Sequence, residues 1–131
     1  MPPRRKSKKR DAIYALLAST KSHPTAEWIY TQLKDEIPDL SLGTVYRNLA
    51  LFQEERHAIC VATVRGQERY DGNVEPHAHF ICRGCGAVLD IDDMELPELP
   101  VGIGTIESYQ LNYYGLCRDC EKKTNEGETN A

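Results

Sequence analysis

The chain has 131 residues and a formal net charge of −4, from 16 Lys and Arg against 20 Asp and Glu. This length suits one ordinary domain or two small ones, and small cores gain from an external staple such as a bound metal. No apolar run approaches the roughly 20 residues of a membrane span, and the basic N-terminus lacks the apolar stretch of a secretory signal, so we expect a cytoplasmic protein without membrane contact.

Charge is spread unevenly along the chain. Residues 1–64 carry ten Lys and Arg against seven Asp and Glu, whereas residues 65–131 carry six against thirteen, giving +3 and −7. Six of the ten cations open the chain: Arg4, Arg5, Lys6, Lys8, Lys9 and Arg10. Such a block attracts phosphate, although taken alone it is more typical of a solvated tail.

Apolar periodicity predicts three helices in the first half. The first covers about residues 10–19. The second begins after Thr25 as N-cap and runs to about residue 36, before Pro38, and the third begins after Ser41 as N-cap. The short connection between the last two is typical of a helix-turn-helix. The residues that set these periods are Ile13, Leu16, Leu17, Trp28, Ile29, Leu33, Val45, Leu49 and Phe52.

A two-stranded hairpin is predicted next, because residues 59–64 and 68–71 alternate around Arg65-Gly66-Gln67. Three helices followed by a hairpin describe a winged helix, whose third helix enters the DNA major groove. An ordinary solvated surface residue is the alternative for Arg47, but the basic N-terminus favours DNA binding. The candidate DNA contacts are Arg5, Lys9, Arg10, Thr44, Tyr46, Arg47, Asn48 and Arg65.

The second half begins with a Gly, Asn and Pro stretch that suits a hinge at residues 73–76. Short strands are predicted at 79–81 and 87–89, and a longer strand at 105–114. Between them, prolines and glycines allow at most a brief helix at 94–99.

Two C-x-x-C pairs, Cys82/Cys85 and Cys117/Cys120, carry the strongest metal signal. Four thiolates at this spacing suit a closed tetrahedral zinc site, which contributes on the order of 10 kcal/mol to folding. A redox dithiol is the alternative, but it would stand at a helix start after a βαβ pattern, whereas both pairs here lie between predicted strands. The fifth cysteine, Cys60, is expected to be a buried or half-buried thiol.

A second group of potential ligands combines imidazoles with carboxylates. His77 and His79 alternate in an extended segment, so both can face one ion, and Asp90 lies just beyond the strand that should pair with theirs. With His23 and Asp71 they form a mixed set that suits iron(II) or manganese(II). No Glu stands at H-E-x-x-H spacing, which argues against a zinc hydrolase, and we expect no enzyme.

Several motifs follow one another over most of the chain. They are His23-Pro24-Thr25-Ala26, Ser41-x-x-Thr44-Val45-Tyr46-Arg47-Asn48-Leu49, Arg69-Tyr70-Asp71, His77-x-His79-x-x-Cys82-x-x-Cys85-Gly86 and Tyr114-Gly115-x-Cys117-x-x-Cys120. In this order, and over about residues 5–123, they resemble the ferric-uptake-regulator family of metal-dependent repressors.

Pattern and resemblance together imply an α+β protein. We expect an N-terminal winged-helix DNA-binding domain at 1–72, a hinge at 73–76, an α/β dimerisation and metal-binding domain at 77–123 and a disordered tail at 124–131. The resemblance implies a structural zinc on the four paired cysteines, and a homodimer that binds a palindromic double-stranded DNA operator.

Within the family, the second ligand set resembles that of the peroxide-stress branch. That branch holds its regulatory iron or manganese with three His and two Asp, at positions that match His23, Asp71, His77, His79 and Asp90. The resemblance implies that iron(II) reacts with hydrogen peroxide and that oxygen is inserted into His23 or His77, whereas manganese gives an insensitive repressor. An iron-responsive repressor without peroxide sensing is the alternative, because iron-sensing relatives differ mainly in having Glu at the two Asp positions.

Three departures from the family pattern stand out. The family's N-terminal helix is longer, and the stretch at 97–104 is short where relatives carry a fuller helix. Arg56-His57 replaces the usual Gly-apolar pair after the third helix, so we expect that helix to end without an easy left-handed cap.

Overall fold

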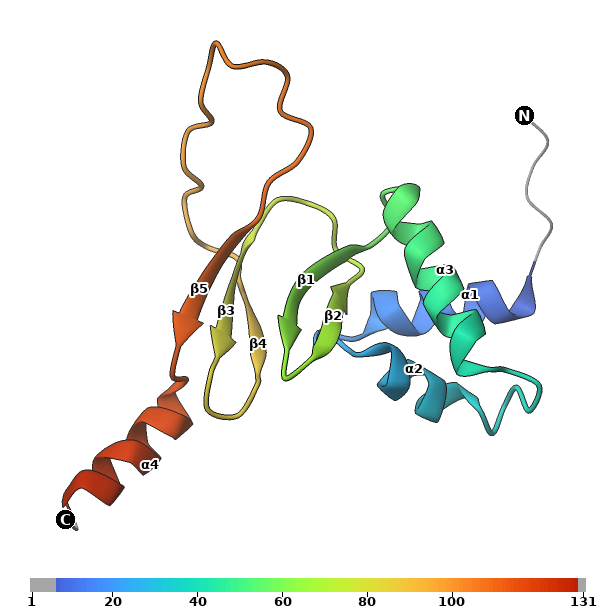
Figure 1. The fold of residues 1–131 in the computed structure, drawn as a ribbon, viewed down its shortest axis with the longest axis horizontal. Coiled ribbons are helices and arrows are strands. Elements are labelled where there is room, and N and C mark those ends of the chain that lie inside the picture. The colour runs from blue at the N-terminus through green and yellow to red at the C-terminus, as the bar shows by residue number, and fades with distance from the viewer. Residues whose placement is uncertain (1–6, 130–131) are drawn as a thin grey trace. The chain divides into compact units, whose positions relative to one another are not determined.

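The computed structural model describes residues 7–129, and it divides between Val74 and Glu75 into two compact units. The first unit holds three helices and a hairpin, and the second holds a three-stranded sheet and a helix (Figure 1). The predicted α+β class is confirmed, and the division falls within the stretch 73–76 that the sequence marks as a hinge. Among the described residues, no helix combines the length and the apolar character that crossing a bilayer requires.

The three predicted helices are present in the first unit. They are α1 (Lys8–Ser19), α2 (Ala26–Leu33) and α3 (Leu42–Glu54). Each begins after a hydroxyl side chain that accepts a backbone N–H three residues on, which satisfies one of the unpaired amides of the first turn. These caps are Ser7, Thr25 and Ser41.

Two helix limits differ from the sequence prediction. Cap Ser7 starts α1 at residue 8 instead of 10. Helix α2 ends at Leu33 instead of 36, because the Leu33 carbonyl accepts from both Glu36 and Ile37 and so closes the last turn ahead of Pro38.

The three helices share one apolar core. Ile13 and Leu17 of α1, Ile29 of α2 and Val45 and Leu49 of α3 are buried in it, as their helical spacing predicts. Trp28 belongs to the same periodic pattern but is partly exposed.

Helix α3 ends with a left-handed cap formed by Arg56, although no glycine stands there to adopt this conformation easily. Arg56 has φ 61°. Its N–H donates to the Gln53 carbonyl at 3.1 Å and the His57 N–H donates to the Phe52 carbonyl at 2.7 Å, the bond pattern of a Schellman motif. A non-glycine residue in this conformation costs about 1–2 kcal/mol, which the two closing hydrogen bonds offset.

The hairpin consists of β1 (Ile59–Val64) and β2 (Gln67–Asp71), paired antiparallel with a bulge between Cys60 and Ala62. Arg65 (φ 54°) and Gly66 (φ 79°) form the two-residue loop, and positive φ at both positions is typical of the type I′ turn that matches strand twist. The hairpin is confirmed, with its second strand beginning one residue earlier than predicted.

The sheet of the second unit has the order β4-β3-β5. Its strands are β3 (Ala78–Cys82), β4 (Val88–Ile91) and β5 (Leu111–Gly115). Strand β4 pairs antiparallel with β3 across a tight turn, whereas β5 runs parallel to β3 after a long connection.

Two predictions for the second half are corrected. The strand expected over 105–114 begins only at Leu111, because that residue pairs with Ala78, the first residue of β3, and earlier residues have no strand to pair with. At 94–99, where the sequence allows at most a brief helix, none forms, and Pro97 lacks the N–H that a helix needs. The tail predicted as disordered from 124 is helical to Thr129, as part of α4 (Arg118–Thr129).

Helix α4 starts within the second cysteine pair. The Glu121 N–H donates to the Cys117 carbonyl at 2.8 Å, and Asp119 and Glu121 place carboxylates in the first turn, where they stabilise the helix dipole. Residues 130–131 of the predicted tail lie outside the described residues.

Candidate metal centres and DNA-binding face

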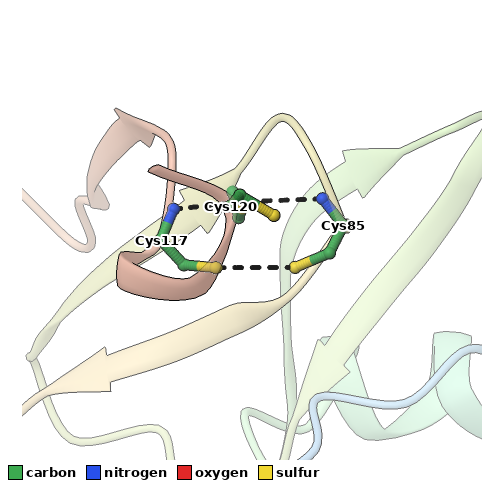
Figure 2. A group of neighbouring side chains, drawn as sticks. Cys85, Cys117 and Cys120 are labelled. Atoms are coloured by element: carbon green, nitrogen blue, oxygen red, sulfur yellow. Dashed lines mark hydrogen bonds between the residues drawn. The ribbon is translucent and has the colours of Figure 1, made fainter. Parts of the chain in front are cut away.

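The four paired cysteines come together in the second unit. Cys82 ends β3, Cys85 lies in the β3–β4 turn, Cys117 precedes α4 and Cys120 lies in its first turn. Their sulfur atoms all lie within 4.8 Å of one another, and those of Cys85 and Cys117, which point toward each other in Figure 2, are 3.8 Å apart. A tetrahedral zinc with Zn–S bonds of about 2.3 Å sets its sulfurs about 3.8 Å apart, so the donor set fits that ion.

Backbone amides acidify the thiol of Cys82. Its Sγ accepts from the N–H groups of Cys117 and Gly84 at 3.3 Å and of Cys85 at 3.4 Å. These bonds, led by those from Cys117 and Cys85, lower the pKa of Cys82 to about 5. The pKa of Cys120 is raised, because its S–H donates to the sulfur atoms of Cys82 and Cys117 and keeps its proton to do so. A thiolate ready at neutral pH is the form that binds zinc.

Glycine is required inside the first pair. A Cβ added at Gly84 would stand 2.9 Å from the Sγ of Cys120 and 3.2 Å from its Cβ, closer than these atoms can approach without displacement. The missing side chain thus lets the second cysteine pair reach the first.

In the first unit, His23 and Asp71 form a buried pair. The Nε2 atom of His23 lies 3.3 Å from an Asp71 carboxylate oxygen, and the His23 side chain is 1% exposed. The other Asp71 oxygen accepts from the Asn73 N–H at 2.9 Å, which orients the carboxylate. The α1–α2 loop and the end of β2 thus bring a nitrogen and an oxygen donor together.

Arg69 holds His23 in position, a role that the sequence reading missed. Its guanidinium donates to the backbone carbonyls of Ser22, at 2.7 Å, and of His23. The Tyr70 N–H donates to the Pro24 carbonyl at 3.0 Å, so strand β2 fastens the whole loop. His23 itself has φ 54°, a left-handed conformation that needs such support. The Arg-Tyr-Asp motif was the available signal, because two of its members bind the His23 loop and the third faces the imidazole.

In the second unit, His77, His79 and Asp90 meet on one carboxylate oxygen. The Nε2 atoms of His77 and His79 lie 2.9 and 3.2 Å from Asp90 Oδ1. Their rings lie against each other, with centroids 4.2 Å apart. Asp90, predicted just beyond its strand, lies within β4 directly opposite His79. The prediction that alternate residues bring both imidazoles to one side is confirmed.

The tautomer of His77 indicates which of its ring nitrogens can bind a cation. Its Nδ1 lies 2.7 Å from the Glu75 carbonyl oxygen, and because a carbonyl can only accept, Nδ1 carries a proton. In a neutral imidazole the Nε2 atom then holds the lone pair, and it faces a carboxylate oxygen. Two such groups face each other stably only with a cation between them, either a proton or a metal ion. A ligating His whose other nitrogen donates to a carbonyl is typical of metal sites.

Helix α3 presents the predicted polar face. Tyr46 is exposed, and the Arg47 guanidinium donates to Thr44 Oγ1 at 3.0 Å. Thr44 also contacts the cap Ser41, and Asn48 donates to the Thr44 carbonyl at 2.9 Å. These bonds orient the side chains along one surface of the helix that a helix-turn-helix inserts into DNA.

The other predicted DNA contacts lie outside helix α3. Lys9 pairs with Asp39 at 3.0 Å, which lowers the pKa of that carboxyl, and Arg10 lies 3.7 Å from Asp11. Arg65 lies in the exposed hairpin turn. Arg5 lies outside the described residues.

Cys60 is half-buried, as expected. Burial, followed by the nearby Glu68 carboxylate, raises the pKa of its thiol. A thiol with a raised pKa is protonated at neutral pH and is a poor nucleophile.

The family model of the ferric uptake regulator family matches residues 4–114. The chain belongs to this family. It is therefore a metal-dependent regulator of transcription that binds DNA as a dimer, and the prediction that it is not an enzyme is confirmed.

Similar proteins include two named peroxide regulators. The peroxide operon regulator of Bacillus subtilis (strain 168) is 33% identical over 121 residues, covering 88% of this chain and 83% of that protein. The peroxide-responsive repressor PerR of Staphylococcus epidermidis is 31% identical over 121 residues, covering 88% and 81%. The structure of the Helicobacter pylori ferric uptake regulator Fur superposes with a TM-score of 0.72 at 22% identity, covering 89% of this chain and 82% of that one, which supports the fold.

Proposed function

We propose that this family member is a repressor that senses hydrogen peroxide at a regulatory iron(II) or manganese(II) site and is held together by a structural zinc. The two similar proteins named above are a peroxide operon regulator and a peroxide-responsive repressor, both at more than 30% identity over most of their length. We place its action in the cytoplasm, where its DNA would be.

The structural zinc is assigned to Cys82, Cys85, Cys117 and Cys120. The sulfur spacing and the lowered pKa of Cys82 support this assignment. The zinc would join the β3–β4 turn to the start of α4, whose cysteines Cys85 and Cys117 stand 32 residues apart in the sequence.

The regulatory metal is assigned to His23, Asp71, His77, His79 and Asp90. The observation that carries this proposal is the pair of imidazole Nε2 atoms on Asp90 Oδ1, one of them in the tautomer that a metal-binding His requires. Nitrogen and carboxylate donors suit iron(II) and manganese(II) better than the thiolates of the cysteine cluster do. Because His23 and Asp71 belong to the first unit and the others to the second, such a site would couple the two units.

Peroxide sensing would act through His23 or His77. Iron(II) held by these residues would activate hydrogen peroxide there. One peroxide oxygen would be inserted into a C–H bond of the His23 or His77 imidazole and the other would leave as water, so the two electrons that the peroxide takes up would come from the imidazole. An imidazole oxidised in this way is a weaker metal ligand, so the unit that carries it would no longer bind the metal ion firmly. Redox-inert manganese(II) would leave both imidazoles intact.

DNA binding would place α3 of each subunit of a homodimer in successive major grooves of a palindromic operator. The proposed contacts are Lys9, Arg10, Thr44, Tyr46, Arg47, Asn48 and Arg65, with Arg5 from the segment outside the described residues. Metal would favour the arrangement of the two units in which both α3 helices meet the operator, and its loss would release transcription.

The test separates the two metals. Asp90→Ala should lower manganese(II) affinity more than 100-fold and abolish manganese-dependent operator binding, because one oxygen serves both imidazoles, while one zinc per chain is retained. Asp93→Ala, an exposed carboxylate on the following connection, is the matched control and should change neither. Loss of zinc in Asp90→Ala, or operator binding at wild-type manganese concentrations, would overturn the ligand assignment.

A further inference from the structure

One face of the β4-β3-β5 sheet is apolar and partly exposed to solvent. Residues directly opposite each other in neighbouring strands share a face, and Phe80 stands opposite both Leu89 and Tyr113. Ala78 likewise stands opposite Ile91 and Leu111. Leu89 is 48% exposed and Tyr113 41% exposed. The other face carries His79 and Asp90 and belongs to the proposed metal site.

The exposure of this face follows from the connection between β4 and β5. Strand β4 ends and β5 begins at the same end of the sheet, because Ile91 and Leu111 both stand opposite Ala78. Here residues 92–110 contain neither helix nor strand, and they leave the sheet as a long open loop (Figure 1). The connection therefore returns to the end of the sheet from which it departs, and it does not have to cross this face.

The same loop carries a second exposed apolar surface at its tip. Val101 is 91% exposed, Ile103 74% and Leu99 45%. Gly102 and Gly104 separate them with positive φ values of 82° and 138°, so the tip keeps an extended path without regular structure. Three large apolar side chains within five residues are an unusual exposure for a small domain.

We propose that the loop tip Leu99–Ile103 of one subunit packs on the Phe80, Leu89 and Tyr113 face of a second copy of this chain, and that the exchange is reciprocal. Loop tip and sheet face are both apolar and both present once per chain, so a two-fold pairing covers two of each. The dimeric state of the family supplies the partner, and this contact would lie in the unit proposed to dimerise. A nucleic-acid partner is disfavoured, because the loop residues 92–110 include five carboxylates and no Lys or Arg.

The test is a complementation experiment on the zinc-loaded full chain. The arm variant carries Val101→Asp and Ile103→Asp, and the face variant carries Tyr113→Glu. Each alone breaks both contacts of its own dimer, so its dimer dissociation constant should rise at least 100-fold in sedimentation analysis. Mixed together, the intact arm of the face variant meets the intact face of the arm variant, and a mixed dimer should form with a dissociation constant near the geometric mean of wild type and variants. Ser108→Asp, an exposed position of the same loop, is the matched control and should dimerise like wild type.

Two results would overturn the proposal. Wild-type dimerisation of either variant would show that the contact is not used. Weakened variants that do not complement would show that the loop tip and the sheet face act in the dimer through separate contacts and do not pack on each other. Zinc content and circular dichroism establish that the variants fold. If the charged arm variant loses zinc, Val101→Ser with Ile103→Ser replaces it, with a smaller shift in the same direction. The measurement needs no regulatory metal, so its outcome is independent of peroxide sensing.

Discussion

Replacing Arg69 by Met should separate the positioning of His23 from the metal chemistry itself. Met keeps much of the apolar stem but removes the donors to the Ser22 and His23 carbonyls. Hydrogen bonds from a charged donor contribute about 1.5–3 kcal/mol when buried, and these are partly exposed, so we expect the free energy of unfolding to fall by about 2 kcal/mol in total. For a unit of this size that corresponds to a drop of about 8–16 °C in melting temperature.

The same change should weaken metal binding. Without Arg69, His23 can leave its left-handed conformation and its Nε2 can turn away from Asp71. Residues that orient a ligand typically contribute about 10–100-fold to metal affinity, and we expect a loss of that size for manganese(II), measured by titration calorimetry. Operator affinity at saturating manganese should recover to the wild-type value, because Arg69 acts through His23.

Two control variants sharpen this measurement. Arg69→Lys keeps the charge and can reach one carbonyl, so it should lie between wild type and Arg69→Met. Arg65→Met removes an arginine from the same hairpin and should lower operator affinity without changing manganese affinity. The reasoning is refuted if Arg69→Met binds manganese like wild type and melts within about a degree of it.

Two further substitutions test the local geometry. Gly84→Ala should lower zinc affinity about 10-fold or more in chelator competition, because the new methyl group meets the Cys120 sulfur, whereas Gly43→Ala, with its nearest atom at 3.9 Å, should leave zinc affinity unchanged; equal zinc retention would contradict the crowding argument. Arg56→Gly should raise the free energy of unfolding by about 1 kcal/mol and the melting temperature by about 4–8 °C, because glycine adopts the left-handed cap without strain. Arg56→Ala keeps the strain and serves as its control, and a lower melting temperature for the glycine variant would count against the cap.

Short-range sequence patterns predicted most of the helices and strands of the first unit. Each helix has its own apolar period and its own hydroxyl cap, and the Arg65-Gly66 loop sets the hairpin register, so no distant contact is needed to find them. The helix ends that differ from the prediction depend on hydrogen bonds that the apolar pattern of the sequence does not encode. The left-handed Arg56 is an example, since residue type alone argues against it.

The second unit was harder to predict because its strand arrangement depends on pairing between residues that are far apart in the sequence. Strand β5 begins where β3 can pair with it, which no local alternation reveals. The cysteine spacing identified the cluster correctly. The backbone N–H groups whose hydrogen bonds acidify Cys82, however, come from residues up to 35 positions away. The role of Arg69 was hidden for the same reason, since it binds carbonyls 46 and 47 residues earlier in the chain.

Operator binding with each metal, before and after peroxide, tests the central proposal most directly. Protein loaded with iron(II) should lose operator binding after brief exposure to low hydrogen peroxide, and peptide mass spectrometry should find one added oxygen on the peptide that carries His23 or His77. Manganese-loaded protein should keep binding and show no added oxygen. Peroxide-resistant binding of the iron-loaded protein, with both histidine peptides unmodified, would contradict peroxide sensing and leave an iron-responsive repressor.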